Sequence, residues 1–307
     1  MEGALSQMAM LLAAVVAGYI ATGLGYLDNH VKEKLTKLLL NVTLPCMILA
    51  SVGDVDRSAA GVQIPWAFGL AVAQFFLLLA AGALCNAVLR VPRSERRMYL
   101  FMSVCTNTGF IGLPVVAAVL GDGSIISSSI FIMVISLFMY SVGFALLAPR
   151  GQGRLSVPWR SAVNPAMAGC LLAIALFLLG VRLPSLVEGS LDLIGSVTAP
   201  IAMMLVGVIM KGTRLRDVAA EWRLYPYIAI RQLTVPAALY LALRPVVPDA
   251  TALGVFTIMF AMPVGSMASM FAGQFGQDQR LPAKGTVLST AASFAVIPLL
   301  VLFMASA

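Results

Sequence analysis

Ten long apolar segments, separated by short charged or turn-rich connections, constrain the fold of this chain most strongly. A membrane-spanning helix needs about 20 predominantly apolar residues, and each segment is long enough to cross the hydrocarbon or nearly so. In a chain of 307 residues, ten spans leave no room for a second folded domain. We therefore predict an all-α integral membrane protein with ten transmembrane helices. The predicted spans are 4–26, 37–53, 65–89, 98–120, 125–148, 164–181, 191–210, 225–246, 252–275 and 285–305.

The composition excludes a soluble enzyme. Hydrophobic residues make up 60% of the chain and charged residues 11%, whereas an average soluble protein has roughly 25% charged residues. The four cysteines lie inside apolar segments without a CxxC pair, so neither a disulfide framework nor a zinc site is expected. The single histidine and the absence of hydrolase, metalloprotease and phosphate-binding motifs argue against catalysis, and no cofactor is expected.

The basic residues predict the orientation of the chain in a cell (inner) membrane. Of the 20 Lys and Arg residues, 16 lie in the connections that follow the first, third, fifth, seventh and ninth spans. Lysine and arginine accumulate on the cytoplasmic side, so both termini are predicted to be extracytoplasmic. The net charge of +7 is thus a topology signal, and nucleic-acid binding is not expected.

Two matches at one offset indicate an internal repeat. Residues 42–45 (Val-Thr-Leu-Pro) and 197–200 (Val-Thr-Ala-Pro) are 155 residues apart, and so are Gly121 and Gly276. Five spans per half is an odd number, so the second half would enter the membrane from the opposite face. Such inverted repeats, here 1–155 and 156–307, are common in secondary transporters. The alternative is a gene duplication that retains no transport.

Two of the predicted helices contain residues that interrupt a helix. Residues 106–114 of the fourth span read Thr-Asn-Thr-Gly-Phe-Ile-Gly-Leu-Pro, and residues 261–266 of the ninth read Ala-Met-Pro-Val-Gly-Ser. A proline donates no hydrogen bond and clashes with the preceding turn, so we predict breaks centred on Pro114 and Pro263. Interrupted helices at matching positions of two halves point to a transporter's binding site. The alternative is a pair of kinks that serve packing only.

The two breaks favour an anionic ligand, because each creates a half-helix N-terminus with a partial positive charge and free N–H groups. Asn107 and Thr108 are expected to donate from their side chains, and Gly109, Gly112, Gly265 and Ser266 from their backbone amides. The kinked second span adds candidates on a polar stretch before Pro45. The predicted substrate-binding residues are Thr106, Asn107, Thr108, Gly109, Gly112, Pro114, Pro263, Gly265, Ser266, Ser269, Asn41 and Thr43.

No Asp or Glu lies in the interior of a predicted span, although a buried carboxylate is the usual handle for a coupling ion. Coupling or gating could use Asp122, Asp192 or Asp278 at helix ends, a sodium ion held by carbonyls and hydroxyls, or a substrate that carries its own proton. Uniport and exchange also remain open. Arg231 is an intramembrane cation that either snorkels to the headgroups or serves as counter-ion for an anionic solute.

Several of these motifs together resemble the auxin efflux carrier family, within the bile acid/auxin-type transporter superfamily. The chain lacks the long cytoplasmic loop of the plant carriers and so looks like a compact prokaryotic member. The motifs are residues 41–45 (Asn-Val-Thr-Leu-Pro), 106–114, 200–207 (Pro-Ile-Ala-Met-Met-Leu-Val-Gly), 261–263 (Ala-Met-Pro), 276–278 (Gly-Gln-Asp) and Ser289, Thr290, Ser293 and Pro298.

The resemblance implies a scaffold domain from helices 1, 2, 6 and 7 and a transport domain from helices 3–5 and 8–10. It also implies a crossing of helices 4 and 9 in the transport domain, elevator-type alternating access, small organic anions such as malonate or malate as substrates, and a homodimer through the scaffold. The alternatives are a sodium-coupled organic anion symporter of the bile-acid type and a solute sensor that binds without translocating.

Overall fold

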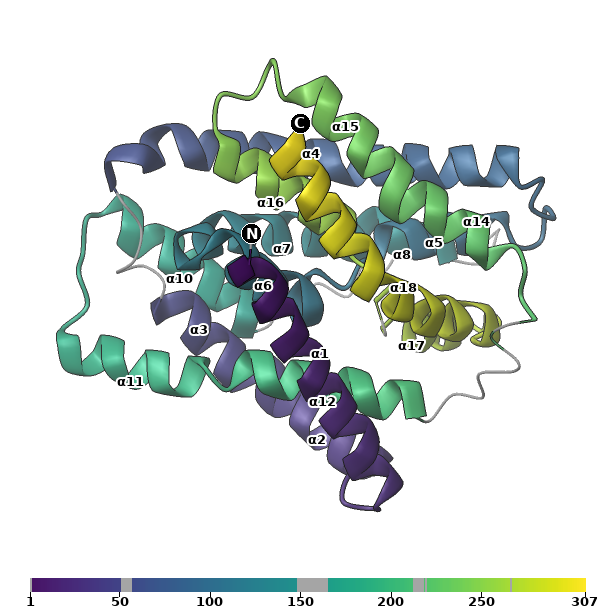
Figure 1. Cartoon of the computed structure of the whole chain (residues 1–307), viewed down its shortest axis with the longest axis horizontal. Coiled ribbons are helices and arrows are strands. Elements are labelled where there is room, and N and C mark those ends of the chain that lie inside the picture. The colour runs from purple at the N-terminus through teal and green to yellow at the C-terminus, as the bar shows by residue number, and fades with distance from the viewer. Residues whose placement is uncertain (1, 51–56, 148–164, 212–217, 219, 266) are drawn as a thin grey trace.

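The described part of the chain is all helical, as predicted (Figure 1). The computed structural model describes the whole chain except residues 1, 51–56, 148–164, 212–217, 219 and 266. Within the described residues, three helices are long and apolar enough to cross a membrane: Ile64–Val88, Ser185–Val208 and Arg280–Ser306. These properties are those of a membrane protein.

Helices of the structure overlap each predicted span. The first half contains α1 (Glu2–Gly23), α2 (Asn29–Leu38), η1 (Leu39–Thr43), α3 (Leu44–Ala50), α4 (Arg57–Val88), α5 (Arg96–Val104), η2 (Thr108–Gly112), α6 (Leu113–Leu120), η3 (Asp122–Ser124), α7 (Ile125–Phe138), η4 (Met139–Gly143) and α8 (Phe144–Leu147). The second half contains α10 (Pro165–Leu178), α11 (Ser185–Gly195), α12 (Thr198–Lys211), α14 (Leu224–Ile228), η5 (Ala229–Thr234), α15 (Val235–Leu243), α16 (Ala250–Phe260), α17 (Met267–Gln274) and α18 (Arg280–Ser306).

A helix precedes the second predicted span and runs into it. This helix starts at Asn29, because the Asp28 carboxylate accepts a hydrogen bond from the Val31 amide (2.7 Å) and so caps the N-terminus. This α2 segment is polar enough that apolar content alone did not include it. The helix of the third span likewise begins at Arg57, before the apolar run.

Three π-helices end two residues before a proline. η1 precedes Pro45, η2 precedes Pro114 and η5 precedes Pro236. A proline lacks the amide that the helix needs and clashes with the carbonyl four residues earlier, so a widened turn before it accommodates both defects. By contrast, Pro200 lies in the first turn of α12, where its missing N–H costs no hydrogen bond.

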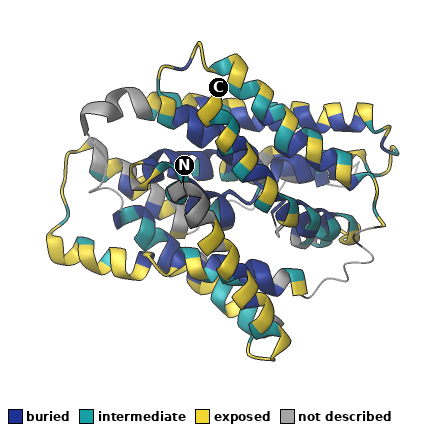
Figure 2. Ribbon diagram, viewed as in Figure 1, coloured by how far each residue is buried: buried dark blue, intermediate teal, exposed yellow. Residues whose placement is uncertain are grey.

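Helices at the centre of the molecule are buried on nearly every side, whereas α1 and α11 expose apolar side chains (Figure 2). In α16, every residue from Ala252 to Phe260 is buried. An all-round apolar helix is expected in the interior of a membrane protein. On α11, the side chain of Leu186 is 80% exposed, which suits contact with lipid. The two helices predicted to be broken therefore lie in the protected interior.

Candidate functional site

The fourth predicted span is broken, but not at Pro114. α5 ends at Val104, residues 105–107 are non-helical, and the helix resumes at Thr108 as η2. Pro114 lies seven residues beyond this non-helical segment, in the first turn of α6. The prediction of an interrupted helix is confirmed, whereas its placement at Pro114 is wrong, because the widened turn of η2 accommodates that proline without ending the helix.

The ninth predicted span is broken at Pro263, as predicted. α16 ends at Phe260 and α17 begins at Met267. Residues 261–265 between them are non-helical and buried. Ser266 lies outside the described residues, so the structure does not place this predicted site residue.

The two broken segments contact each other directly through their backbones. The Asn107 amide donates to the Pro263 carbonyl (2.8 Å), and the Gly265 amide donates to the Cys105 carbonyl (2.7 Å). Thr106 and Val264 face each other between these bonds as an antiparallel bridge. Each non-helical segment thus finds in the other a partner for one amide that lost its helical hydrogen bond.

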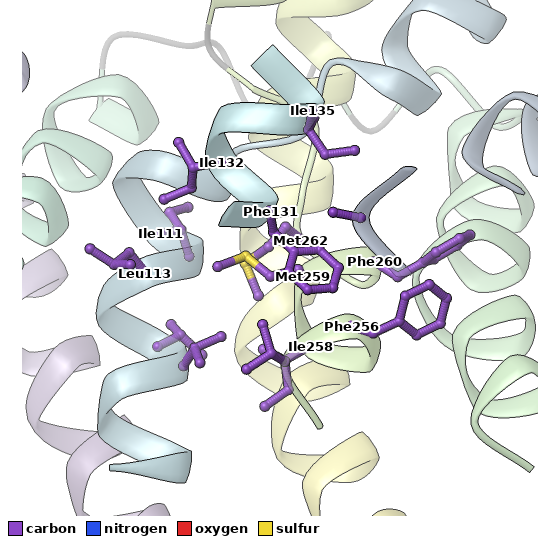
Figure 3. Close-up of a cluster of buried hydrophobic side chains, with 14 of the residues drawn as sticks. Ile111, Leu113, Phe131, Ile132, Ile135, Phe256, Ile258, Met259, Phe260 and Met262 are labelled. Atoms are coloured by element: carbon purple, nitrogen blue, oxygen red, sulfur yellow. The ribbon is translucent and has the colours of Figure 1, made fainter. Parts of the chain in front are cut away.

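Apolar side chains pack around this crossing. Met259 and Met262 lie in a buried cluster with Ile111 and Phe131 (Figure 3). A Cβ atom at Gly112 would lie 2.8 Å from the Met259 sulfur, so a glycine here lets η2 approach the ninth span closely.

The eighth predicted span supplies two polar side chains to the crossing. Arg231 is fully buried, and its guanidinium donates to the carbonyl of Met262 and to that of Ser103 (3.2 Å). The neighbouring Gln232 side chain donates to the Ala261 carbonyl (3.0 Å). The interpretation of Arg231 as a snorkelling residue is wrong, because carbonyls freed by the breaks hold its side chain in the interior.

Helix α18 supports the second break from another direction. The Ser289 hydroxyl accepts a hydrogen bond from the Val264 amide (3.0 Å), and the Thr286 hydroxyl donates to the Gly265 carbonyl (3.2 Å). Unpaired backbone groups are costly in the membrane interior, so these side chains allow the break to persist there.

Three polar side chains at the first break, those of residues 106–108, have no hydrogen-bond partner among the described residues. The side chains of Asn107 and Thr108 are 7% and 5% exposed, and neither forms a hydrogen bond with the described residues. The Thr106 hydroxyl is buried without a partner in the same part of the chain. A Cβ atom at Gly109 would meet nothing within 4 Å, so open space adjoins this turn. The segment therefore combines unpaired donors with room beside them.

Two of the predicted amide donors are already used within the protein. The Gly112 amide donates to the Asn107 carbonyl (3.0 Å), and the Gly265 amide donates to Cys105. The expectation that Gly112 and Gly265 present free amides is therefore wrong. Both glycines instead permit close approach of the two segments, since a Cβ at Gly265 would lie 3.3 Å from the Cys105 carbonyl oxygen.

The remaining predicted site residues take no part in the pairing of the two segments. Ser269 is half-buried in α17. Asn41 is exposed on η1, and the buried Thr43 hydroxyl donates to the Leu39 carbonyl of the same turn (3.4 Å). The crossing therefore does not include η1 in this conformation.

The acidic residues considered for coupling are not in the crossing. Asp192 is exposed on α11, and Asp278 is exposed beyond α17, where it accepts a hydrogen bond from the Arg280 amide (2.9 Å). Asp122 begins η3, beyond the end of α6. In the described ranges, the one ion pair joins Lys284 to Glu221 (3.2 Å), so Arg231 has no carboxylate partner there.

Sequence reasoning missed Gln232 and Ser103, which help to hold the two breaks. A signal for Gln232 was present, since Arg-Gln in the middle of an apolar segment places two polar side chains where each needs a partner. Ser103 contributes its backbone carbonyl, which no side-chain pattern reveals.

Comparisons with known proteins show which family the sequence resembles. The sequence model of a family described as membrane transport protein matches residues 4–302. An uncharacterized transporter of Methanocaldococcus jannaschii is 23% identical over 299 residues, covering 94% of this chain and 95% of that protein. One of Methanothermobacter thermautotrophicus is 23% identical and covers 97% of both chains. The uncharacterized transporter YfdV of Escherichia coli K12 is 20% identical over 65% of this chain and 66% of its own length.

Proposed function

Because the chain belongs to the membrane transport protein family, which confirms the resemblance to the auxin efflux carriers, we propose that it is a secondary transporter of small organic anions. The substrate binds where the breaks of the fourth and ninth spans pair. The observation that carries this proposal is the direct backbone pairing of residues 105–107 with residues 263–265, beside uncommitted polar groups.

A carboxylate suits this place for electrostatic reasons. The helix that starts with η2 and continues through α6 directs its N-terminal amides toward the crossing, and α17 begins just after the second break. Helix N-termini favour anions through their free N–H groups and partial positive charge. Asn107 and Thr108 add side-chain donors, so a carboxylate would find hydrogen bonds as well as a favourable field.

Close glycine contacts support a division into a scaffold and a transport domain. α1 contacts α12 through Gly18 and Gly207, while Gly169 and Gly195 bring α10 and α11 against α3. All these helices belong to the predicted scaffold. A Cβ atom at four other glycines would lie within 3.4 Å of an atom in another helix. Within the described residues, each of these contacts joins two members of the predicted transport domain, such as Gly82 of α4 with Ser103 of α5. Such packing allows each group to move as a unit.

This division fits an elevator-type cycle in which the crossing moves with its substrate relative to the scaffold. The proposal includes the inverted halves 1–155 and 156–307, both termini on the extracytoplasmic side, and a homodimer formed by the scaffold. Sodium coupling of the bile-acid type is the competing proposal. The described crossing holds no carboxylate for a sodium ion, which favours transport without one.

Counterflow into proteoliposomes tests the proposed function. Vesicles loaded with unlabelled acetate, benzoate, malonate or malate should accumulate the same labelled acid transiently, with or without sodium. Accumulation only with sodium would favour the symporter. Binding without counterflow would identify a sensor.

Asn107→Ala should lower the counterflow rate about tenfold or more, because the site loses a hydrogen-bond donor to a charged ligand. Asn41→Ala is the matched control, since Asn41 is exposed outside the crossing and should retain the wild-type rate. An unchanged rate in Asn107→Ala would remove this residue from the site.

A further inference from the structure

Arg231 is a fully buried cation a few residues past the start of a predicted span, and the described residues offer it no carboxylate. Isolated charges are strongly disfavoured in a low-dielectric interior, so the crossing must contain compensating negative groups. Its two terminal nitrogens bind the carbonyls of Ser103 and Met262, whereas its Nε has no partner among the described residues.

These two carbonyls belong to the C-terminal ends of two half-helices. Ser103 lies in the last turn of α5, and Met262 lies two residues beyond the end of α16. A helix C-terminus carries roughly half a negative elementary charge, so the two ends together carry about one. Arg231 therefore balances the two C-terminal ends at the crossing, one from each half of the chain.

The two N-terminal ends at the crossing are then left without a balancing charge. These are the start of η2, which continues into α6, and the start of α17. Each end carries roughly half a positive elementary charge, so the site retains about one positive charge in total. The second indication of a ligand here is independent of the helix ends, because the buried Asn107 side chain has no hydrogen bond with described residues.

We propose that Arg231 is a specificity-determining residue that sets the charge of the empty site at about one positive unit, so that the preferred substrate carries a single negative charge. This inference rests on the proposed function and narrows its substrate class to monoanions. A bound monocarboxylate makes the crossing electrically neutral, and a neutral site crosses the hydrocarbon at the lowest electrostatic cost. A dianion leaves an unbalanced negative charge there.

Binding of matched acids to purified protein in nanodiscs tests this assignment. Propionate and malonate share a three-carbon skeleton but carry one and two carboxylates, and butyrate and succinate form a second pair. The wild type should bind the monocarboxylate of each pair more tightly at neutral pH, as measured by calorimetric titration. Preference for malonate and succinate would overturn the inference while leaving organic anion transport intact. Binding of none of the acids would overturn both.

Variants of Arg231 separate its charge from its hydrogen bonds. Arg231→Gln keeps a donor but removes the charge, and it should weaken monocarboxylate binding about tenfold or more, as is typical when a buried charge partner is lost. Arg231→Lys keeps a cation but cannot bridge both carbonyls as the guanidinium does, so it should bind monocarboxylate more weakly than the wild type and more tightly than Arg231→Gln. Arg244→Gln, at the exposed far end of the same span, is the matched control and should bind normally. Equal binding by Arg231→Gln would overturn the inference.

A measurement on the wild type decides the question if Arg231→Gln does not fold. Proteoliposomes with saturating monocarboxylate on both sides exchange labelled for unlabelled substrate, which involves only the loaded site. If the loaded site is neutral, a potassium-diffusion potential should leave the exchange rate unchanged. A rate that depends on the potential would show that the loaded site carries charge, which contradicts the inference.

Discussion

At the scale of single residues, the crossing exchanges helical hydrogen bonds for tertiary ones. The Val264 amide binds the Ser289 hydroxyl, and the Gly265 amide binds the Cys105 carbonyl. In water such groups could pair with solvent, but in a membrane interior each must find a partner within the protein. The side chains that supply these partners therefore determine whether the breaks can exist.

Ser289→Ala should destabilise the protein, because the Ser289 hydroxyl supports the second break from α18. It leaves the buried Val264 amide unpaired, and such a loss costs about 1–3 kcal/mol of folding free energy. We expect a lower melting temperature of the purified protein in detergent. Ser190→Ala is the matched control, because the Ser190 hydroxyl donates to Leu186 on an exposed face and should leave the melting temperature unchanged. Equal melting temperatures would contradict the role assigned to Ser289.

Individual residues were predictable from the sequence to different degrees. Asn107 stands out as a polar residue inside an apolar segment, and the structure finds it buried at the crossing. Arg231 stands out equally, but its partners are backbone carbonyls of two distant segments. Because every residue carries a carbonyl, the sequence contains no signal that distinguishes these two from the others.

At the scale of helices, proline predicted irregularity better than it predicted position. Pro263 lies in the break of its helix, whereas Pro114 follows a π-helix and the chain leaves the helix at residues 105–107. Local propensity allows either outcome for a Thr-Asn-Thr-Gly stretch. Pairing with residues 263–265 selects the non-helical form, and the partner of Thr106 in that pairing, Val264, is 158 residues away in the chain.

The contact between α1 and α12 depends on two glycines that let the two backbones touch (Figure 1). A Cβ at Gly207 would lie 2.1 Å from the Val15 carbonyl oxygen, and one at Gly18 would lie 2.1 Å from that of Met204. Small residues at such positions let membrane helices associate closely. This pair joins the two halves of the chain within the proposed scaffold.

Gly207→Ala should therefore force α1 and α12 apart and lower stability, since overpacking costs about 1–3 kcal/mol. The expected result is a clear decrease in melting temperature and in the yield of monodisperse protein. Gly69→Ala in α4 is the control, because a Cβ there meets nothing within 4 Å. Similar behaviour of the two variants would show that the close contact is not needed.

At the scale of the whole molecule, the helical class and the breaks followed from the sequence, while the arrangement of helices did not. Gly121 and Gly276, matched at one offset, both have left-handed backbone, at φ 84° and 67°, at or just beyond the ends of α6 and α17. The two matched glycines thus share a positive φ near a helix end. Which helices pack together depends on contacts such as Gly195 against Met47, which no periodicity reveals.

The orientation in the membrane gives a prediction for the whole chain. In an otherwise cysteine-free background, Arg182→Cys should react with a membrane-impermeant maleimide in intact cells, because its connection is predicted to be extracytoplasmic. Lys34→Cys should react only after permeabilisation. Both side chains are exposed, so accessibility depends on the side of the membrane. The reverse pattern would invert the proposed topology.

Protection of a cysteine at position 109 by substrate tests most directly whether the paired breaks form the anion site. Open space adjoins Gly109, so Gly109→Cys in the same cysteine-free background should react with a small thiol reagent. A saturating carboxylate that the wild type transports should slow this reaction several-fold, whereas the corresponding uncharged amide should not. A reaction rate that this carboxylate leaves unchanged would contradict a site at the crossing.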